Sequence, residues 1–192
     1  MRTISILLFG VLILRQLNCY GQNILPEKSL QLSDFKFNSI FGHQSTDSLH
    51  IYCLLGTGFF RTPRAENSDS LISNWTDEHP KANIVPVSTL VDSSMNLTYC
   101  LVVDKTDTLN VFLIKNGCFP GGTMQRPETW AEMPKEKKKV YSDTERELKI
   151  EIPKPNIVVH MEKNSYENYI EQIKRAEQYA SENKLGIWKS EN

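Results

Sequence analysis

The clearest pattern of apolar and polar positions lies near the end of the chain, in residues 165–188. Apolar side chains recur there every three or four residues, which is the period of an α-helix with one buried face. Asn164 followed by Glu167 is the pattern of an N-terminal capping box. Gly186 is placed to end the helix in a left-handed conformation, and an Ile-Trp pair follows it. The helical positions expected to be buried are Tyr169, Ile170, Ile173, Ala176, Tyr179 and Ala180.

A second pattern predicts a strand, a tight turn and a helix within residues 97–117. Apolar residues alternate from Leu97 to Val103, as in a strand with one buried face. Residues 104–108 are rich in side chains that favour turns and helix starts. The apolar residues after this turn have helical spacing, and Gly117 marks the end of the helix. The predicted core positions of this helix are Leu109, Phe112 and Leu113.

Shorter patterns lie upstream. Residues 69–79 place apolar side chains on one helical face, and Pro80 ends that helix. Residues 50–55 and 83–88 have the composition of strands. Residues 22–44 also carry spaced apolar positions, which predict one additional strand. The positions behind these predictions are Leu71, Ile72 and Trp75 in the helix, and Leu30, Leu32, Phe35, Phe37 and Ile40 in the additional strand.

The first residues are typical of a signal peptide. A basic residue precedes an apolar run from Ile4 to Leu14, which is too short to cross a bilayer comfortably, and small residues follow at the two positions that define a cleavage site. This predicts removal of residues 1–21 and an exported protein, secreted or periplasmic, that keeps no transmembrane span. Two alternatives stay open, an uncleaved membrane anchor and a lipoprotein attached through Cys19. Gln16 argues against the lipoprotein, because it stands where that motif has Leu.

Charge and cysteine content narrow the range of functions. Without the signal peptide the chain has 20 basic and 23 acidic residues, a net charge of −3. Nonspecific nucleic-acid binding depends on basic side chains that displace counterions, so this balance opposes it. The mature chain keeps Cys53, Cys100 and Cys118, an odd number. Cys53 and Cys100 lie in predicted strands, where buried free thiols are favoured over a disulfide.

Residues 119–155 carry turn residues, then a lysine-rich stretch, then the alternating pattern of residues 148–152. This order predicts a hairpin or flap. In one interpretation Gly121 and Gly122 form a backbone nest for a phosphate, with Arg126 and the lysines as its positive rim. In the other, this is a loop with a solvated basic helix. Charge runs usually only hydrate a surface, which favours the second interpretation.

The order of these elements resembles the staphylococcal nuclease (thermonuclease-like) family. That family opens its second helix with an apolar-Asn pair, as Leu109 and Asn110 do here, and ends in Leu-x-Ile-Trp or Gly-Ile-Trp, as residues 185–188 do. The resemblance covers roughly residues 46–118 and 156–188. It implies an α+β, mainly β fold, a five-stranded Greek-key barrel of the oligonucleotide-binding type with three helices.

The resemblance also divides the chain. Residues 1–21 are the signal peptide and residues 22–45 an N-terminal extension. The domain covers residues 46–188, with residues 119–155 as an inserted hairpin or flap, and residues 189–192 form a tail. A monomer is expected.

Members of that family cleave phosphodiesters with a calcium ion held by carboxylates, a Glu that orients water, and two Args. The Args offset the charge that develops on the phosphate in the transition state. Asp47 precedes the predicted strand 50–55 as the family's calcium ligand precedes its own strand, so it is the candidate metal ligand here. Met95 stands where the family has its second Arg.

The rest of the family motif fits in two registers. If residues 61–64 match Asp-Thr-Pro-Glu, both carboxylates are replaced by Arg61 and Arg64, and the site is inactive. If Arg61 instead matches the family's first catalytic Arg, Glu66 and Asp69 fall where the two carboxylates belong. The first register keeps the Thr-Pro turn, which favours it.

Three functions are therefore considered. The first is an exported domain with a degenerate nuclease site that binds single-stranded nucleic acid, a protein or a glycan. The second is a divergent calcium-dependent nuclease acting on extracellular DNA or RNA. The third is a structural module associated with the cell envelope. Singly, each candidate also has a plain structural role, since Asp47 can cap a turn and Glu66 and Asp69 suit a helix N-terminus.

Overall fold

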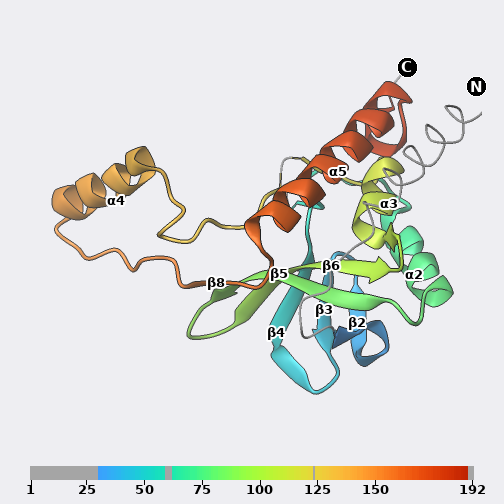
Figure 1. Cartoon of the computed structure of the whole chain (residues 1–192), viewed down its shortest axis with the longest axis horizontal. Helices are drawn as coiled ribbons and strands as arrows, with labels where there is room; N and C mark the ends of the chain where they lie inside the picture. The colour runs from blue at the N-terminus through green and yellow to red at the C-terminus, as the bar shows by residue number, and fades with distance from the viewer. Residues whose placement is uncertain (1–29, 59–61, 123, 190–192) are drawn as a thin grey trace, which may run out of the picture.

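The computed structural model describes residues 30–58, 62–122 and 124–189. The fold is α+β and mainly β, as the sequence predicts, and its centre is one strongly curled sheet (Figure 1). The predicted signal peptide and Arg61 lie outside the described residues.

The strands are β1 (Leu30–Gln31), β2 (Phe35–Asn38), β3 (Phe41–Gln44), β4 (Asp47–Leu54), β5 (Asn83–Val91), β6 (Asn96–Asp104), β7 (Asp107–Thr108) and β8 (Ile157–Val159). The helices are η2 (Leu32–Asp34), α2 (Ser68–Glu78), α3 (Leu109–Lys115), α4 (Lys135–Leu148), α5 (Lys163–Glu182) and η3 (Gly186–Trp188).

The strands follow the order β1-β5-β6-β4-β3-β2, with β7 on β6 and β8 on β5. Strands β4 and β6 run parallel, and the other described pairs are antiparallel. Only the short helix η2 separates β1 from β2, although these strands lie at opposite ends of the strand order. Residues 30–44, for which the pattern predicts one additional strand, therefore form three strands of the main sheet.

Helices α3 and α5 cover one end of the sheet (Figure 1). The predicted apolar face of α5 is confirmed at five of its six positions, because Tyr169, Ile170, Ile173, Ala176 and Ala180 are all buried. Tyr179 is the exception, with 46% of its surface exposed. Its ring lies 5.1 Å from the ammonium group of Lys115 on α3, so its contact with the neighbouring helix is a cation–π interaction at the surface.

Both ends of α5 differ from the prediction. The helix begins at Lys163 after Glu162, without a side-chain cap, so Asn164 lies inside the first turn. It ends at Glu182, and the left-handed residue after it is Lys184, with φ +52°. The amide of Leu185 donates to the carbonyl of Ala180, the bond expected when a left-handed residue follows the helix.

Gly186 has a different role from the predicted helix cap. A Cβ atom on Gly186 would lie 2.1 Å from the carbonyl oxygen of Gly117, and the Ile187 amide donates to that same oxygen at 2.9 Å. Two backbones therefore meet where only glycine fits, and this contact joins the C-terminal tail to the end of α3.

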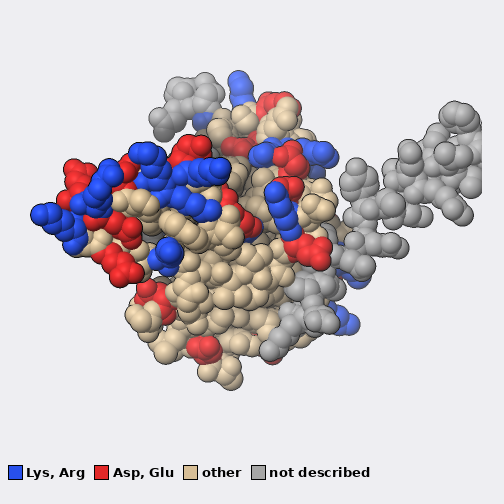
Figure 2. Space-filling view, turned by 60° about the vertical axis from the view of Figure 1, so that its left-hand side comes forward, with Lys and Arg blue, Asp and Glu red and all other residues tan. Residues whose placement is uncertain are grey.

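Residues 119–155 form a helical excursion, and the predicted hairpin is wrong. Helix α4 continues to Leu148 and stops at Lys149, which is left-handed (φ +54°). Residues 149–156, all of them described, contain no strand, because the helix takes up the first residue of the alternating pattern and Pro153 and Pro155 limit pairing beyond it. Helix α4 buries none of its residues and projects from the sheet (Figure 1). Acidic and basic side chains mix over it, beside a surface with few charges (Figure 2).

The three described cysteines are buried and unpaired, which confirms the favoured interpretation. Burial raises the pKa of Cys118 to about 11 and that of Cys53 to about 12, so both thiols stay protonated at neutral pH.

Within the described residues, no helix combines the length and the apolar character needed to cross a bilayer.

Candidate functional site

A pocket of about 430 Å³ opens beside the β2–β3 turn, where this turn meets the chain that follows β4, the start of α2 and the start of the excursion. Two aromatic rings and four small polar side chains surround one cation and one carboxylate. Its lining residues are Asn38, Ser39, Ile40, Phe41, Thr57, Thr62, Arg64, Asp69 and Phe119.

Backbone and side-chain hydrogen bonds fix the wall of the pocket after β4. The hydroxyl of Thr57 donates to the carbonyl of Leu54 at 2.7 Å, which turns the chain at the end of the strand. Gly58 follows with φ +78°, and a Cβ atom there would meet the Thr62 side chain at 2.3 Å. The amide of Ala65 donates to the carbonyl of Cys118 at 3.0 Å. The segment between β4 and α2 is thus held against the start of the excursion.

The charges of the pocket belong to Arg64 and Asp69. The Arg64 guanidinium lies 3.6 Å from the Asp69 carboxylate and donates to the Ser39 hydroxyl at 3.1 Å. Both charged side chains are more than half exposed. An exposed pair of this kind adds only about 0–1 kcal/mol of stability, so little holds Arg64 in this one position. A ligand with an acceptor group can therefore recruit it at small cost.

The structure brings some of the predicted site residues together and separates others. Arg64 and Asp69 both line the pocket, whereas Glu66 is exposed and is not among the lining residues. Arg61 lies outside the described residues. Asp47 is the first residue of β4 and Leu54 the last, which places them roughly 23 Å apart along the strand. The Asp47 carboxylate accepts the amide of Leu49 at 3.0 Å, which is the plain turn-capping role.

The described lining of the pocket does not fit the calcium site that the resemblance implies. Calcium takes six to eight oxygen ligands, several of them carboxylates. Asp69 is the one carboxylate that the structure describes in this lining, and it already faces Arg64. Across the described ranges, no three His, Cys, Asp or Glu side chains gather as they would around a metal ion.

The predicted phosphate nest holds an anion from the chain itself. The amide of Gly122 donates to the carboxylate of Glu177 on α5 at 3.0 Å. A Cβ atom on Gly122 would lie 2.4 Å from that oxygen, so the carboxylate fills the space above the glycine. This contact corrects the phosphate interpretation of Gly121 and Gly122, because the donor it requires is already used.

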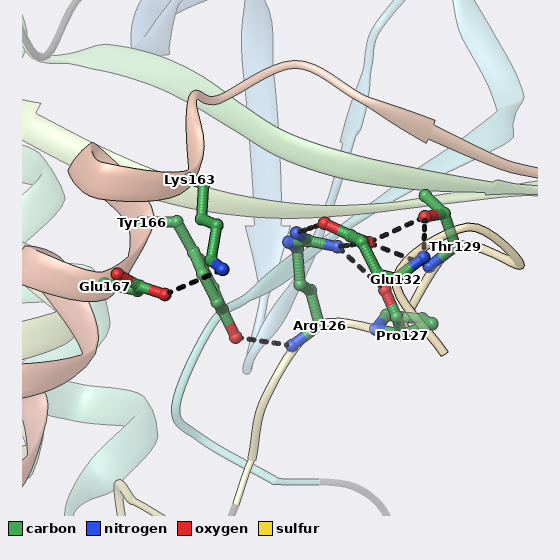
Figure 3. A network of polar contacts seen from close by, with 7 residues as sticks. All are labelled: Arg126, Pro127, Thr129, Glu132, Lys163, Tyr166 and Glu167. Atoms are coloured by element: carbon green, nitrogen blue, oxygen red, sulfur yellow. Dashed lines mark hydrogen bonds and ion pairs between the residues drawn. The ribbon is translucent and has the colours of Figure 1, made fainter. Parts of the chain in front are cut away.

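Arg126 is likewise engaged within the chain (Figure 3). Its guanidinium donates to both carboxylate oxygens of Glu132, at 2.9 and 2.5 Å, and lies 4.8 Å from the centre of the Tyr166 ring. Only 6% of its side chain is exposed. The bonds from Arg126 and from Thr129 lower the pKa of Glu132 to about 2. Arg126 is therefore part of a clamp that fastens the start of the excursion to α5, and it is not free to act as the rim of an anion site.

The sequence patterns miss part of the pocket, above all Asn38 and Ser39. One signal for both was present. Asn-Ser stands between the apolar residues Phe37 and Ile40, and Ser39 adopts φ +59°, as polar turn residues in tight hairpins often do. Phe119 opens the segment predicted as a flap, and it does line the pocket.

Comparison with known proteins gives no family. A scan against protein-family models finds no match, and a search of curated proteins finds no significant similarity. The pocket geometry and the sequence patterns are therefore the evidence for the function of this chain.

Proposed function

We propose that this chain is an exported domain with the staphylococcal-nuclease architecture whose pocket binds a ligand without cleaving it. The observation that carries the proposal is the charge content of the pocket. Its described charges are one arginine and one aspartate that face each other, and the candidate metal ligand, Asp47, lies at the far end of β4.

The strand order supports the barrel architecture. Taken as one interrupted strand, β1 and β2 pair with β5 at one end and with β3 at the other, which joins the two ends of the order. A five-stranded Greek-key barrel needs such a shared first strand. The parallel pair β4/β6 and the position of α2 between β4 and β5 agree with the same architecture. Export rests on the signal-peptide pattern of residues 1–21.

Charge argues for binding over cleavage. Phosphodiester cleavage adds negative charge to the phosphate in the transition state, and fixed cations must offset it. Arg64 is the one cation described in the pocket lining, and Asp69 already offsets its charge. Loss of one such fixed donor costs roughly 3–4 kcal/mol of barrier. Binding needs no such build-up, since an exposed arginine can leave its partner for a ligand.

The lining also indicates the kind of ligand. Phe41, which is partly exposed, offers aromatic surface, and Arg64 offers a cation beside neutral hydroxyl and amide groups. Phe119 is only 2% exposed and belongs to the core, so it shapes the pocket without offering a surface for stacking. Rings stack on aromatic side chains while a charged group pairs with arginine, which is how single-stranded nucleic acids bind without sequence preference. A short single-stranded oligonucleotide is therefore the first probe, ahead of a protein or glycan.

Fluorescence anisotropy of the full chain with labelled single-stranded DNA and RNA tests this proposal, with calcium and with a chelator. We expect binding in both conditions, intact oligonucleotide afterwards, and at least about tenfold weaker binding by Arg64→Ala, since a hydrogen bond to a charged group contributes about 1.5–3 kcal/mol. Arg175 is an exposed arginine of α5 outside the pocket lining, so Arg175→Ala is the control and should bind normally.

Calcium-dependent cleavage that Glu66→Ala and Arg61→Ala abolish would show a divergent nuclease and overturn the proposal. Absence of any binding would overturn the choice of nucleic acid as ligand.

A further inference from the structure

Four side chains form a continuous hydrogen-bonded line across the sheet, and none of them lines the pocket. His50 on β4 contacts Thr98 on β6 at 2.6 Å between Nε2 and Oγ1, and Thr98 contacts Thr89 on β5 at 2.6 Å between their hydroxyl oxygens. Thr89 then contacts Nε2 of His160, the residue after β8, at 2.8 Å. Thr98 and Thr89 are directly opposite in the β5/β6 register, and both are buried. The line, defined as these four residues, thus ties β4, β6, β5 and the end of β8 together.

The number of hydrogens in the line is fixed by its chemistry. Three contacts need three hydrogens, and the two hydroxyl groups supply two of them. One Nε2 atom, and only one, must therefore carry a hydrogen if every donor and acceptor is to be paired. If neither Nε2 atom carries a hydrogen, one of the three contacts joins two lone pairs. If both carry one, a buried hydroxyl hydrogen has no acceptor in the line, and a buried donor without a partner is costly.

The surroundings decide which histidine supplies that hydrogen. Burial lowers the pKa of His50, and the carboxylate of Asp47 opposes this shift. Although His160 is exposed at the surface, partial burial lowers its pKa too, and the positive form of His50 lowers it further. Asp47 acts on the charge of His50, and the Tyr52 ring stacks on His50 with 4.6 Å between ring centres. The Asp47 carboxylate favours the positive form of His50, so once the line has bound one proton His50 is its donor end and His160 its acceptor end.

We propose that this line is a one-proton sensor, in which His50 takes up the first proton on acidification and His160 resists the second. The first proton binds to Nδ1 of His50, which takes no part in the line, so every contact survives. The second must bind to Nε2 of His160, where it leaves the Thr89 hydroxyl hydrogen without an acceptor. The amides of His160 and Met161 both donate to the carbonyl of Val87, so this is where the excursion rejoins the sheet. The second proton thus weakens the hold of the sheet on β8.

Nuclear magnetic resonance of the full chain with nitrogen-labelled histidine tests the sensor. At neutral pH we expect opposite tautomers at the two residues, Nε2–H at one and Nδ1–H at the other, and after the first proton has bound we expect the Nδ1–H tautomer at the still neutral His160. During acidification His50 should titrate first, and His160 should bind its proton at least about tenfold more weakly, a pKa difference of about one unit or more. The same tautomer at both residues, or one shared midpoint, would overturn the proposal.

Variants separate the line from simple burial. Thr89→Val keeps the shape of Thr89 and cuts the line, so the difference between the two histidines should fall below tenfold, because only the effects of Asp47 and of the His50 charge remain. An unchanged difference would contradict the proposal. His50→Gln keeps a donor to Thr98 without a charge and serves if Thr89→Val does not fold. In His50→Gln we expect the Nδ1–H tautomer at His160 and a higher pH at the midpoint of its titration. An Nε2–H tautomer at His160 would contradict its assignment as the acceptor end of the line. His43→Gln, on β3 and exposed, is the control and should leave both signals unchanged.

Discussion

The side-chain amide of Asn110 joins three pieces of backbone that are far apart in the sequence. It accepts the amide of Val102 at 3.0 Å and donates to the carbonyls of Leu55 and Cys100 at 2.9 and 3.1 Å. The residue is fully buried. Asn110, at the start of α3, therefore links the end of β4 to the middle of β6. These bonds explain why Asn follows Leu109 at the start of this helix.

Replacing Asn110 by Ala should destabilise the fold strongly. The change leaves the Val102 amide and the Leu55 carbonyl without their side-chain partner inside the core, whereas the Cys100 carbonyl still accepts the Leu55 amide at 2.9 Å. Each buried unpaired group costs about 1–3 kcal/mol. We expect a loss of at least about 2 kcal/mol in the free energy of unfolding, measured in urea. Asn116→Ala is the matched control. The exposed side-chain amide of Asn116 donates to the carbonyl of Phe112, so its loss should cost less than about 1 kcal/mol. Equal losses in the two variants would refute this account of Asn110.

Single residues also show how far the sequence predicts the candidate site. Arg64 and Asp69 are predicted together and do meet, because both lie within a few residues of the start of α2. Asp47 is predicted beside them and does not meet them, because an eight-residue strand carries its two ends apart. Asn38 and Ser39 are not predicted as site residues, since they reach the pocket only through packing between segments distant in the sequence.

At the scale of elements, prediction succeeds where one face of a long element is buried. Helix α5 and the β6–α3 unit have apolar positions that repeat over many residues, so their type is clear from sequence. Residues 30–44 form strands of only two to four residues, whose alternation is too short to reveal their partners. Residues 148–152 alternate like a strand, yet they find no partner in the sheet, and the helix before them claims Leu148.

The end of α5 offers a test in which two neighbouring positions respond in opposite ways. Lys184 is left-handed without being glycine, whereas Gly186 is left-handed and pressed against Gly117. Lys184→Gly should raise the free energy of unfolding by up to about 1 kcal/mol, because it removes the strain of a side chain at φ +52°. Gly186→Ala should lower it by more than this gain, because a Cβ atom 2.1 Å from a carbonyl forces the tail away. Urea unfolding of both variants measures this, and a stabilising Gly186→Ala would disprove the close contact.

At the scale of the whole molecule, a packed sheet with three helices carries an excursion that adds little to the core. The excursion is fastened at both ends, by the contacts of Arg126 with Tyr166 of α5 where it leaves and by β8 and His160 where it returns. Between these points α4 buries no residue. The anchors thus hold the excursion in place without requiring α4 itself, and the proposed one-proton sensor acts on the second of them.

Removal of α4 should therefore leave the rest of the molecule folded. Met133 and Pro155 line one groove, together with residues of α4, so a Gly-Ser linker can replace the residues between them. Because no residue of α4 is itself buried and a shorter loop costs no more to close, we expect the free energy of unfolding in urea to change by less than about 1 kcal/mol. Ile173→Ala in the buried face of α5 is the comparison and should cost about 2–5 kcal/mol. A loss of that size on removal of α4 would mean that the helix packs against a surface in solution, such as a second copy of the chain, and analytical ultracentrifugation of both proteins would then reveal the partner.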